Sequence, residues 1–179
     1  MNMKPASERN VEIKAKIGSD EEFQKRIDIA KNLTSSIGEL IIQRDVFFKS
    51  QSGRLKLRYL QPPSKSQLLY YDRPDLEGPK LSQYDKIEVD EPEKLEKILA
   101  TTNGIIGIVK KERLLFMHQT TRIHLDKVEG LGNYLEFEVG LSVEQTVEEG
   151  QKIAKEMMET FQINEKDLIV GAYLDKLNK

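Results

Sequence analysis

Hydrophobic and polar residues alternate one by one in eight short segments of the chain. In the segment RNVEIKAKI, the apolar residues Val11, Ile13, Ala15 and Ile17 share one side, and polar residues occupy the other. A period of two predicts β-strands with one apolar face. The expected strands cover residues 10–17, 43–48, 54–60, 67–71, 82–89, 109–117, 121–126 and 134–141.

Four other segments have apolar residues at helical spacing. Ser19 and Glu22 have the spacing of a capping box, and the apolar stripe after them predicts a helix over residues 20–33. Pro92 is tolerated in a first helical turn, so Glu91-Pro92 is expected to open a second, shorter helix. The remaining two helices are expected after the capping-box pair Ser142 and Gln145 and from about residue 165.

Together these elements predict one α+β domain dominated by antiparallel strands. A chain of 179 residues is of ordinary size for a single domain. We find no internal repeat, and the loop at 74–81 is too short to be a domain boundary. The domain is therefore expected to span residues 1–179, with residues 1–8 as a flexible N-terminus.

Composition narrows the class of function. The formal net charge is −2, from 28 basic and 30 acidic residues, so long-range attraction to nucleic acid or to a membrane is not expected. The absence of cysteine excludes disulfides and a cysteine nucleophile and fits a reducing compartment. No apolar run approaches the ~20 residues of a transmembrane helix. We expect a cytoplasmic protein, monomeric or homodimeric, without nucleic-acid or membrane partners.

The polar faces of the expected strands carry an unusual density of charge of both signs. In an open sheet they would form a solvated face with cross-strand ion pairs. Alternatively, eight strands can close into a barrel with the charged residues inside and helices outside. Such an interior would need a bridging ligand, and a polyphosphate with Mg²⁺ or Mn²⁺ fits the mixture of basic and acidic groups.

Six segments resemble, in order and spacing, the CYTH family, also called triphosphate tunnel metalloenzymes. They are NVEIKAK, RDVFF, GRLKLR, LLYYDRPD, VKKERLLF and TRIHLDKVEGLGNYLEFEV, and the closing GAYLDKL extends the match to residue 177. The family is named for class IV adenylyl cyclases and thiamine triphosphatases. The resemblance implies an eight-stranded antiparallel closed barrel, the triphosphate tunnel, with helices packed outside and a site for a triphosphate and a divalent metal.

The resemblance also implies roles for individual residues. The metal ligands would be Glu12, Glu136, Glu138 and Asp126. The substrate-binding residues would be Lys14, Lys16, Lys56, Arg58, Arg73, Lys111, Arg113, Arg122 and His124. The catalytic set would be Glu12, Lys14, Arg58, Tyr71, Arg73 and Glu136.

Two departures from the family pattern affect the expected activity. Asn10 stands where the N-terminal E-x-E-x-K motif has its first glutamate, so that position contributes no charge. Phe47 replaces the tyrosine of a water-activating lysine–tyrosine pair, and the lysine position falls near Tyr71 or Arg73. The expected function is metal-dependent hydrolysis of inorganic tripolyphosphate or of a nucleoside or thiamine triphosphate. The alternatives are a class IV adenylyl cyclase and a triphosphate-binding module without catalysis.

Overall fold

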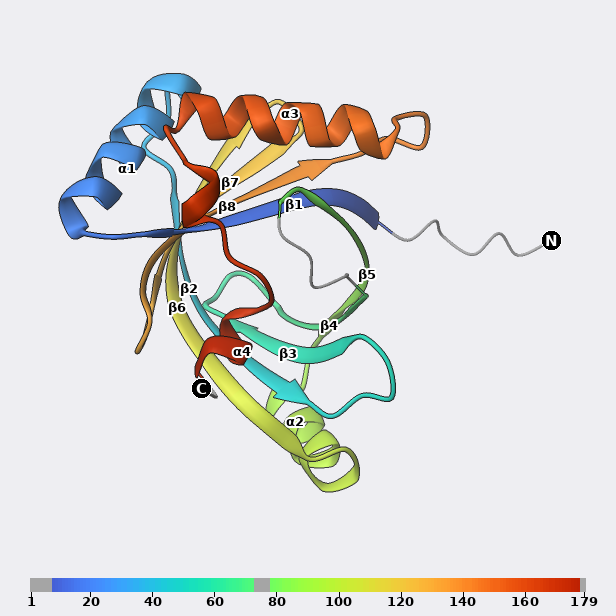
Figure 1. Cartoon of the computed structure of the whole chain (residues 1–179). Coiled ribbons are helices and arrows are strands. Elements are labelled where there is room, and N and C mark those ends of the chain that lie inside the picture. Colours follow the sequence, from blue (N-terminus) through green and yellow to red (C-terminus); the bar gives the residue numbers. More distant parts are fainter. Residues whose placement is uncertain (1–7, 73–77, 178–179) are drawn as a thin grey trace.

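The computed structural model describes residues 8–72 and 78–177, which form eight strands and four α-helices (Figure 1). The strands are β1 (Glu8–Ile17), β2 (Glu39–Phe48), β3 (Arg54–Leu60), β4 (Ser66–Asp72), β5 (Lys80–Val89), β6 (Ile105–His118), β7 (Thr121–Val128) and β8 (Gly132–Gly140). The helices are α1 (Asp20–Thr34), α2 (Pro92–Thr102), α3 (Val147–Thr160) and α4 (Tyr173–Leu177). Glu8 already belongs to β1, whereas the rest of the expected flexible N-terminus lies outside the described residues.

The strands close into an antiparallel barrel in the order β1-β5-β4-β3-β2-β6-β7-β8. This closure confirms the barrel and rules out the open sheet that the alternation also allowed. The first strand pairs with β5 on one side and with β8 on the other, so Glu12 lies opposite Glu138 and Lys14 opposite Glu136. Because side chains alternate along each strand, one charged face after another is turned toward the barrel axis.

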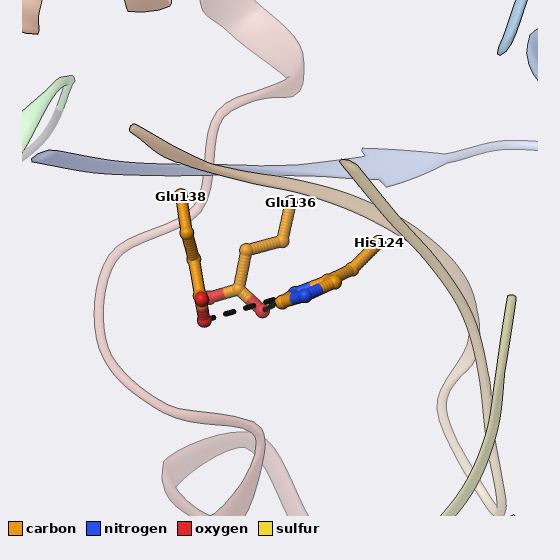
Figure 2. A group of neighbouring side chains, drawn as sticks. All are labelled: His124, Glu136 and Glu138. Carbon is orange, nitrogen blue, oxygen red and sulfur yellow. Dashed lines mark ion pairs between the residues drawn. The ribbon is translucent and has the colours of Figure 1, made fainter. Parts of the chain in front are cut away.

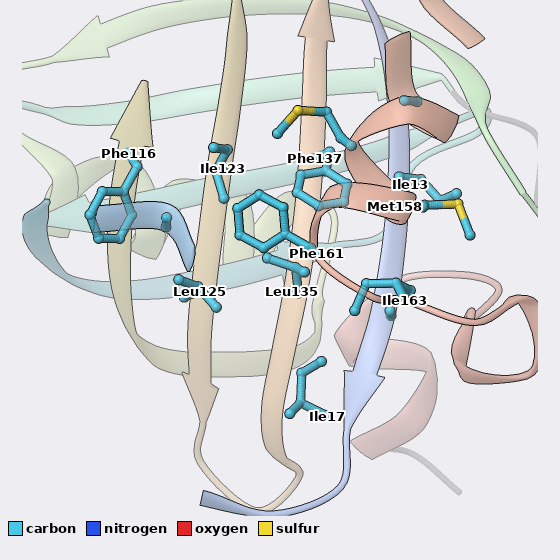
Figure 3. Close-up of a cluster of buried hydrophobic side chains, with 14 of the residues drawn as sticks. Ile13, Ile17, Phe116, Ile123, Leu125, Leu135, Phe137, Met158, Phe161 and Ile163 are labelled. Atoms are coloured by element: carbon cyan, nitrogen blue, oxygen red, sulfur yellow. The ribbon is translucent and has the colours of Figure 1, made fainter. Parts of the chain in front are cut away.

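The main hydrophobic core lies outside one half of the barrel (Figure 3). There α1 and α3 cover the outward faces of β1, β7 and β8. Ile13 and Phe137 come from the strands, and Phe161 at the end of α3 packs edge-on against Phe137 with ring centroids 5.1 Å apart. The apolar face of RNVEIKAKI therefore supports the helices, while Asn10, Glu12 and Lys14 of its polar face line the interior.

The other half of the barrel has a smaller cover. Val46, Phe48 and Leu57 are fully buried and pack against Leu95 and Leu99 of α2. The short α4 lies apart from α2, and its buried Tyr173 joins a third cluster with Phe47 and Val109 inside the barrel. In Figure 1, α4 lies below β1 and close to β3 and β6. Its position brings the C-terminal segment to the barrel interior.

Two helix predictions need correction. The third helix begins at Val147, and its capping box is Thr146 with Glu149, whereas the side chain of Gln145 accepts a hydrogen bond from the Ser142 backbone in the preceding turn. The continuous final helix is also wrong: a 3₁₀ turn at Glu165–Asp167 is followed by an extended segment before α4. The Ser19 cap of α1 is confirmed, since its side chain accepts a hydrogen bond from Glu22 N–H. Across the described segments we find no helix long and apolar enough to span a bilayer.

Candidate triphosphate and metal site

The barrel encloses a cavity of about 270 Å³. Its wall is built by inward side chains from all eight strands, together with Ala172 and with Tyr173, the first residue of α4. This volume is just below the range of roughly 300–1,000 Å³ usual for small-molecule sites, which suits a compact ligand. The cavity is therefore one site to which all eight strands contribute.

Most of the expected site residues do line this cavity. The set comprises Glu12, Lys14, Lys56, Arg58, Tyr71, Lys111, Arg113, Arg122, His124, Glu136 and Glu138. Asn10 and Phe47, the positions where the resemblance implied a glutamate and a tyrosine, lie in the same wall. The sequence alternation thus placed these side chains on the correct side of their strands.

Three expected residues are not part of the described cavity wall. Lys16 is exposed, with its ammonium 6.0 Å from the Tyr134 ring, because β1 continues beyond the cavity before it ends. Asp126 is completely buried and does not line the cavity. Arg73 lies outside the described residues. The candidate site therefore contains none of these three residues.

Other lining residues were missed. Gln43 and Asp45 share the inward face of β2 with Phe47, and Ser82, Tyr84 and Lys86 share the inward face of β5. The alternation along residues 43–48 and 82–89 could have placed these residues on the inward faces of their strands. Tyr173 could not have been found in this way, since it reaches the cavity from a short helix after the last strand.

Asp126 holds two of the basic residues in place. Its carboxylate accepts hydrogen bonds from Arg113 Nε and Nη2, both at 2.7 Å, from Lys111 Nζ at 3.0 Å and from the Tyr173 hydroxyl at 2.9 Å. Burial opposes ionisation of Asp126, but Arg113 and Lys111 hold its pKa well below the usual value. Asp126 therefore acts as a fixed negative charge behind the cavity wall.

Asp45 plays a similar part on β2. Its two oxygens accept hydrogen bonds from Arg58 at 2.9 and 3.0 Å and from the Gln43 amide at 3.1 Å, and Lys56 pairs with it at 3.0 Å. Burial opposes its ionisation, yet Arg58 and Lys56 lower the pKa of Asp45 well below the usual value. These contacts orient the two cations toward the cavity that they line.

Glu136 and Glu138 lie beside His124 on neighbouring strands (Figure 2). Glu136 pairs with Lys14 at 3.3 Å and with Arg113 at 3.0 Å, and Glu138 pairs with Arg122 at 2.8 Å. Burial opposes the charged form of Glu138, but His124 and Arg122 lower its pKa to about 2. Both carboxylates are therefore anionic at neutral pH.

Burial and the nearby Arg113 charge lower the pKa of His124, so its imidazole is neutral at pH 7. One ligand atom from each of His124, Glu136 and Glu138 lies within 4.8 Å of the others. Two carboxylates and a neutral imidazole are a donor set that fits a divalent cation. Glu12, opposite Glu138 on β1, adds a third carboxylate to the same wall.

Two lysines in the wall are poised to change charge near neutral pH. Burial and the neighbouring Arg58 lower the pKa of Lys56 to about 8, and burial and Arg113 lower the pKa of Lys111 to about 7. Crowding of like charges is responsible for part of both shifts. A bound anion would remove this repulsion and favour the ammonium forms.

The cavity is electropositive although the chain as a whole is not. Within residues 8–72 and 78–177, seven lysine and arginine side chains line it against four carboxylates. The formal net charge of the full chain is −2. Positive charge is thus concentrated where a ligand in the barrel would lie, and this arrangement favours a polyanion.

Comparison with known proteins gives the same fold. The family model described as CYTH domain matches residues 8–173. No curated protein matches the sequence significantly. Similar structures include the PH1012 protein from Pyrococcus horikoshii, with a TM-score of 0.77, 22% identity and coverage of 93% of this chain and 98% of that one.

Two further structures share the fold at low identity. A candidate adenylate cyclase from Vibrio parahaemolyticus has a TM-score of 0.77 and 18% identity, covering 98% of this chain and all of that chain (100%). The Pct1 RNA triphosphatase of S. pombe has a TM-score of 0.51 and 13% identity, and the match covers 88% of this chain and 82% of that chain. The family model covers nearly all of the present chain, and the barrel and its charged interior agree with that match. This chain therefore belongs to the CYTH domain family.

Proposed function

We propose that the protein is a divalent-metal-dependent phosphohydrolase that acts on a triphosphate compound. The observation that carries this proposal is the excess of lysine and arginine over carboxylates in a barrel cavity of about 270 Å³. The small volume favours a compact anion, with inorganic tripolyphosphate as the first candidate. Membership of the CYTH family supports the same substrate class.

The basic residues would bind and orient the phosphate chain. Lys14 and Arg113 approach from the side of Glu136, and Lys56 and Arg58 approach from the side of Asp45. Cations from several strands can surround a linear anion and hold it for in-line attack. Because their carboxylate partners already fix these side chains, little reorganisation is required as charge builds up on the phosphate oxygens.

A divalent cation would be held by Glu136, Glu138 and His124, with Glu12 close by. Bound there, it would neutralise charge on the phosphate oxygens. Lys56 lies over the rings of Phe47 and Tyr71, at 5.4 and 5.2 Å from their centroids. With a pKa of about 8, Lys56 is mostly protonated at neutral pH, and a bound polyanion would favour that form further, so we assign Lys56 to phosphate binding.

A cyclase is the second candidate, and the apolar part of the wall favours it. Ile41, Leu60, Leu69 and Leu115 line the same cavity as the charged groups. An adenine ring needs such a surface, and the fold is shared with the candidate adenylate cyclase described above. This activity would release pyrophosphate and cyclic AMP from ATP, whereas the hydrolase would release orthophosphate.

The test is a screen of tripolyphosphate, nucleoside triphosphates and thiamine triphosphate with Mg²⁺ and Mn²⁺. Orthophosphate, pyrophosphate and cyclic nucleotide are measured separately. We expect orthophosphate release that Glu136→Gln abolishes and that Lys110→Gln, a change on the outer face, leaves intact. Cyclic AMP with pyrophosphate would establish the cyclase, and tight triphosphate binding without any turnover would refute both enzymatic proposals in favour of a binding module.

A further inference from the structure

The imidazole of His124 points at the two glutamates of the cavity wall, as Figure 2 shows. Its Nδ1 atom is 3.6 Å from Glu136 Oε2 and 3.7 Å from Glu138 Oε1. These separations are too long for direct hydrogen bonds. The three atoms therefore face a common point without contacting one another.

The Nδ1 atom of His124 is also an unsatisfied buried group. The residue is only 3% exposed, and among the described residues Nδ1 has no hydrogen-bond partner. A buried polar atom without a partner carries a free-energy cost, so structures seldom retain one without a reason. A cation bound between the imidazole and the carboxylates would remove that cost.

Asp45 and Asp126 are not near the imidazole in this way, and the structure pairs their nearest oxygens with cations. Asp45 and Asp126 each accept hydrogen bonds at both oxygens from cations of the wall. In the described part of the chain, Arg122 bonds Oε2 of Glu138, and Oε1 of the same carboxylate faces His124. Glu136 also faces His124, while its Oε1 pairs with Lys14 and its Oε2 accepts a hydrogen bond from Arg113. The geometry therefore singles out one corner of the cavity, where a nitrogen and two carboxylate oxygens converge.

We propose that His124 is a nitrogen ligand of the metal site, and that the site therefore prefers first-row transition-metal ions such as Mn²⁺ and Co²⁺ to Mg²⁺. Mg²⁺ favours oxygen ligands and keeps much of its hydration shell, whereas imidazole is a good ligand for transition metals. Affinity should rise from Mn²⁺ to Co²⁺, following the general order for nitrogen-containing sites. This inference deepens the proposed function: metal binding by His124 does not depend on it, but a role of the bound metal in hydrolysis does.

Metal binding can be tested without turnover. Isothermal titration of the protein with Mg²⁺, Mn²⁺ and Co²⁺ should show at least about tenfold tighter binding of Co²⁺ than of Mg²⁺. His124→Gln replaces the nitrogen ligand by an amide, and it should weaken Co²⁺ and Mn²⁺ binding about tenfold or more while changing Mg²⁺ binding little. The chain contains two histidines, so His118→Gln is the matched control and should leave all three affinities unchanged.

Pulsed electron paramagnetic resonance of bound Mn²⁺ gives a direct second measurement. Coupling to an imidazole nitrogen is expected in the unmodified protein and in His118→Gln, and it should be lost in His124→Gln. If His124→Gln does not fold, the nitrogen coupling in the unmodified protein and in His118→Gln still provides this test. Equal affinities for Mg²⁺ and Co²⁺ with no nitrogen coupling would overturn the inference.

The two proposals can fail separately. Nitrogen coupling from His124 in a protein that hydrolyses no triphosphate would support the metal ligand and refute the hydrolase. Hydrolysis with Mg²⁺ in a protein whose Mn²⁺ complex shows no nitrogen coupling would support the hydrolase and refute the ligand.

Discussion

The substitution Asp126→Asn tests whether the basic wall depends on a buried counter-charge. Asp126 is fully buried and accepts four hydrogen bonds, three of them from Arg113 and Lys111. Asparagine keeps the shape of the side chain but removes its charge. Its amide group would also face hydrogen-bond donors where the carboxylate now accepts from them. Removing one partner of a buried ion pair typically costs about 3–5 kcal/mol.

This cost sets the expected change in thermal stability. One kcal/mol shifts the melting temperature of a protein of this size by about 2–4 °C, so Asp126→Asn should lower it by roughly 6–20 °C. Asp90→Asn is the control: Asp90 pairs with Lys65 on the surface, and such a pair is worth about 0–1 kcal/mol. Differential scanning calorimetry of the three proteins measures the effect.

The pH dependence of the loss provides a second check. Arg113 cannot release its proton, but Lys111 can, because burial and Arg113 already lower its pKa to about 7. Without Asp126 that pKa should fall further, so the unfolded chain binds more protons than the native one and stability rises with pH. The deficit should therefore be smaller at alkaline than at slightly acidic pH. A melting temperature unchanged in Asp126→Asn would refute the assigned role.

Two further predictions concern the ligand and the packing. Tripolyphosphate should bind more weakly as pH rises through 7 and 8, because Lys111 and Lys56 lose the protons that attract it. Titration calorimetry should show that the affinity of Lys111→Arg depends less on pH than that of the unmodified protein. An equal pH dependence in the two proteins would exclude Lys111 as the cause. Gly150→Ala should destabilise the protein by about 1–3 kcal/mol in urea denaturation, although alanine usually stabilises a helix, because its Cβ would lie 2.7 Å from side-chain atoms of Val11 and Leu141; a more stable variant would mean that α3 can move away from β1.

Alternation predicted the strands and their two faces, because it reports which face of a strand is buried, whereas the closed barrel was implied by the resemblance to a family. Val11 and Ile13 mark the outer face of β1, and Glu12 and Lys14 the inner one. Alternation does not report where along its length a strand leaves the cavity. Lys16 lies on the inner face of β1 by alternation, but it is beyond the end of the cavity. Asp126 is fully buried behind the cavity wall.

Pairings across the barrel were the least predictable part of the site. The bond between Tyr173 and Asp126 and the convergence of His124 with two glutamates depend on the registers of several strands. A one-residue slip in any pairing would turn these side chains to the other face. The resemblance to a family supplied the carboxylates of the metal corner, while the imidazole became a metal-ligand candidate only from the three-dimensional arrangement.

The position of β1 has a consequence for how the protein reaches its folded state. This strand is hydrogen-bonded to β5 and to β8, the last strand of the chain. During synthesis β1 is made first, but the pairing of Lys14 with Glu136 must wait until nearly the whole barrel has been made. Such non-local pairing is slow, because loop-closure entropy is lost before contacts are gained. The nascent chain must therefore carry an unclosed sheet edge, a state prone to aggregation, until its last strand emerges.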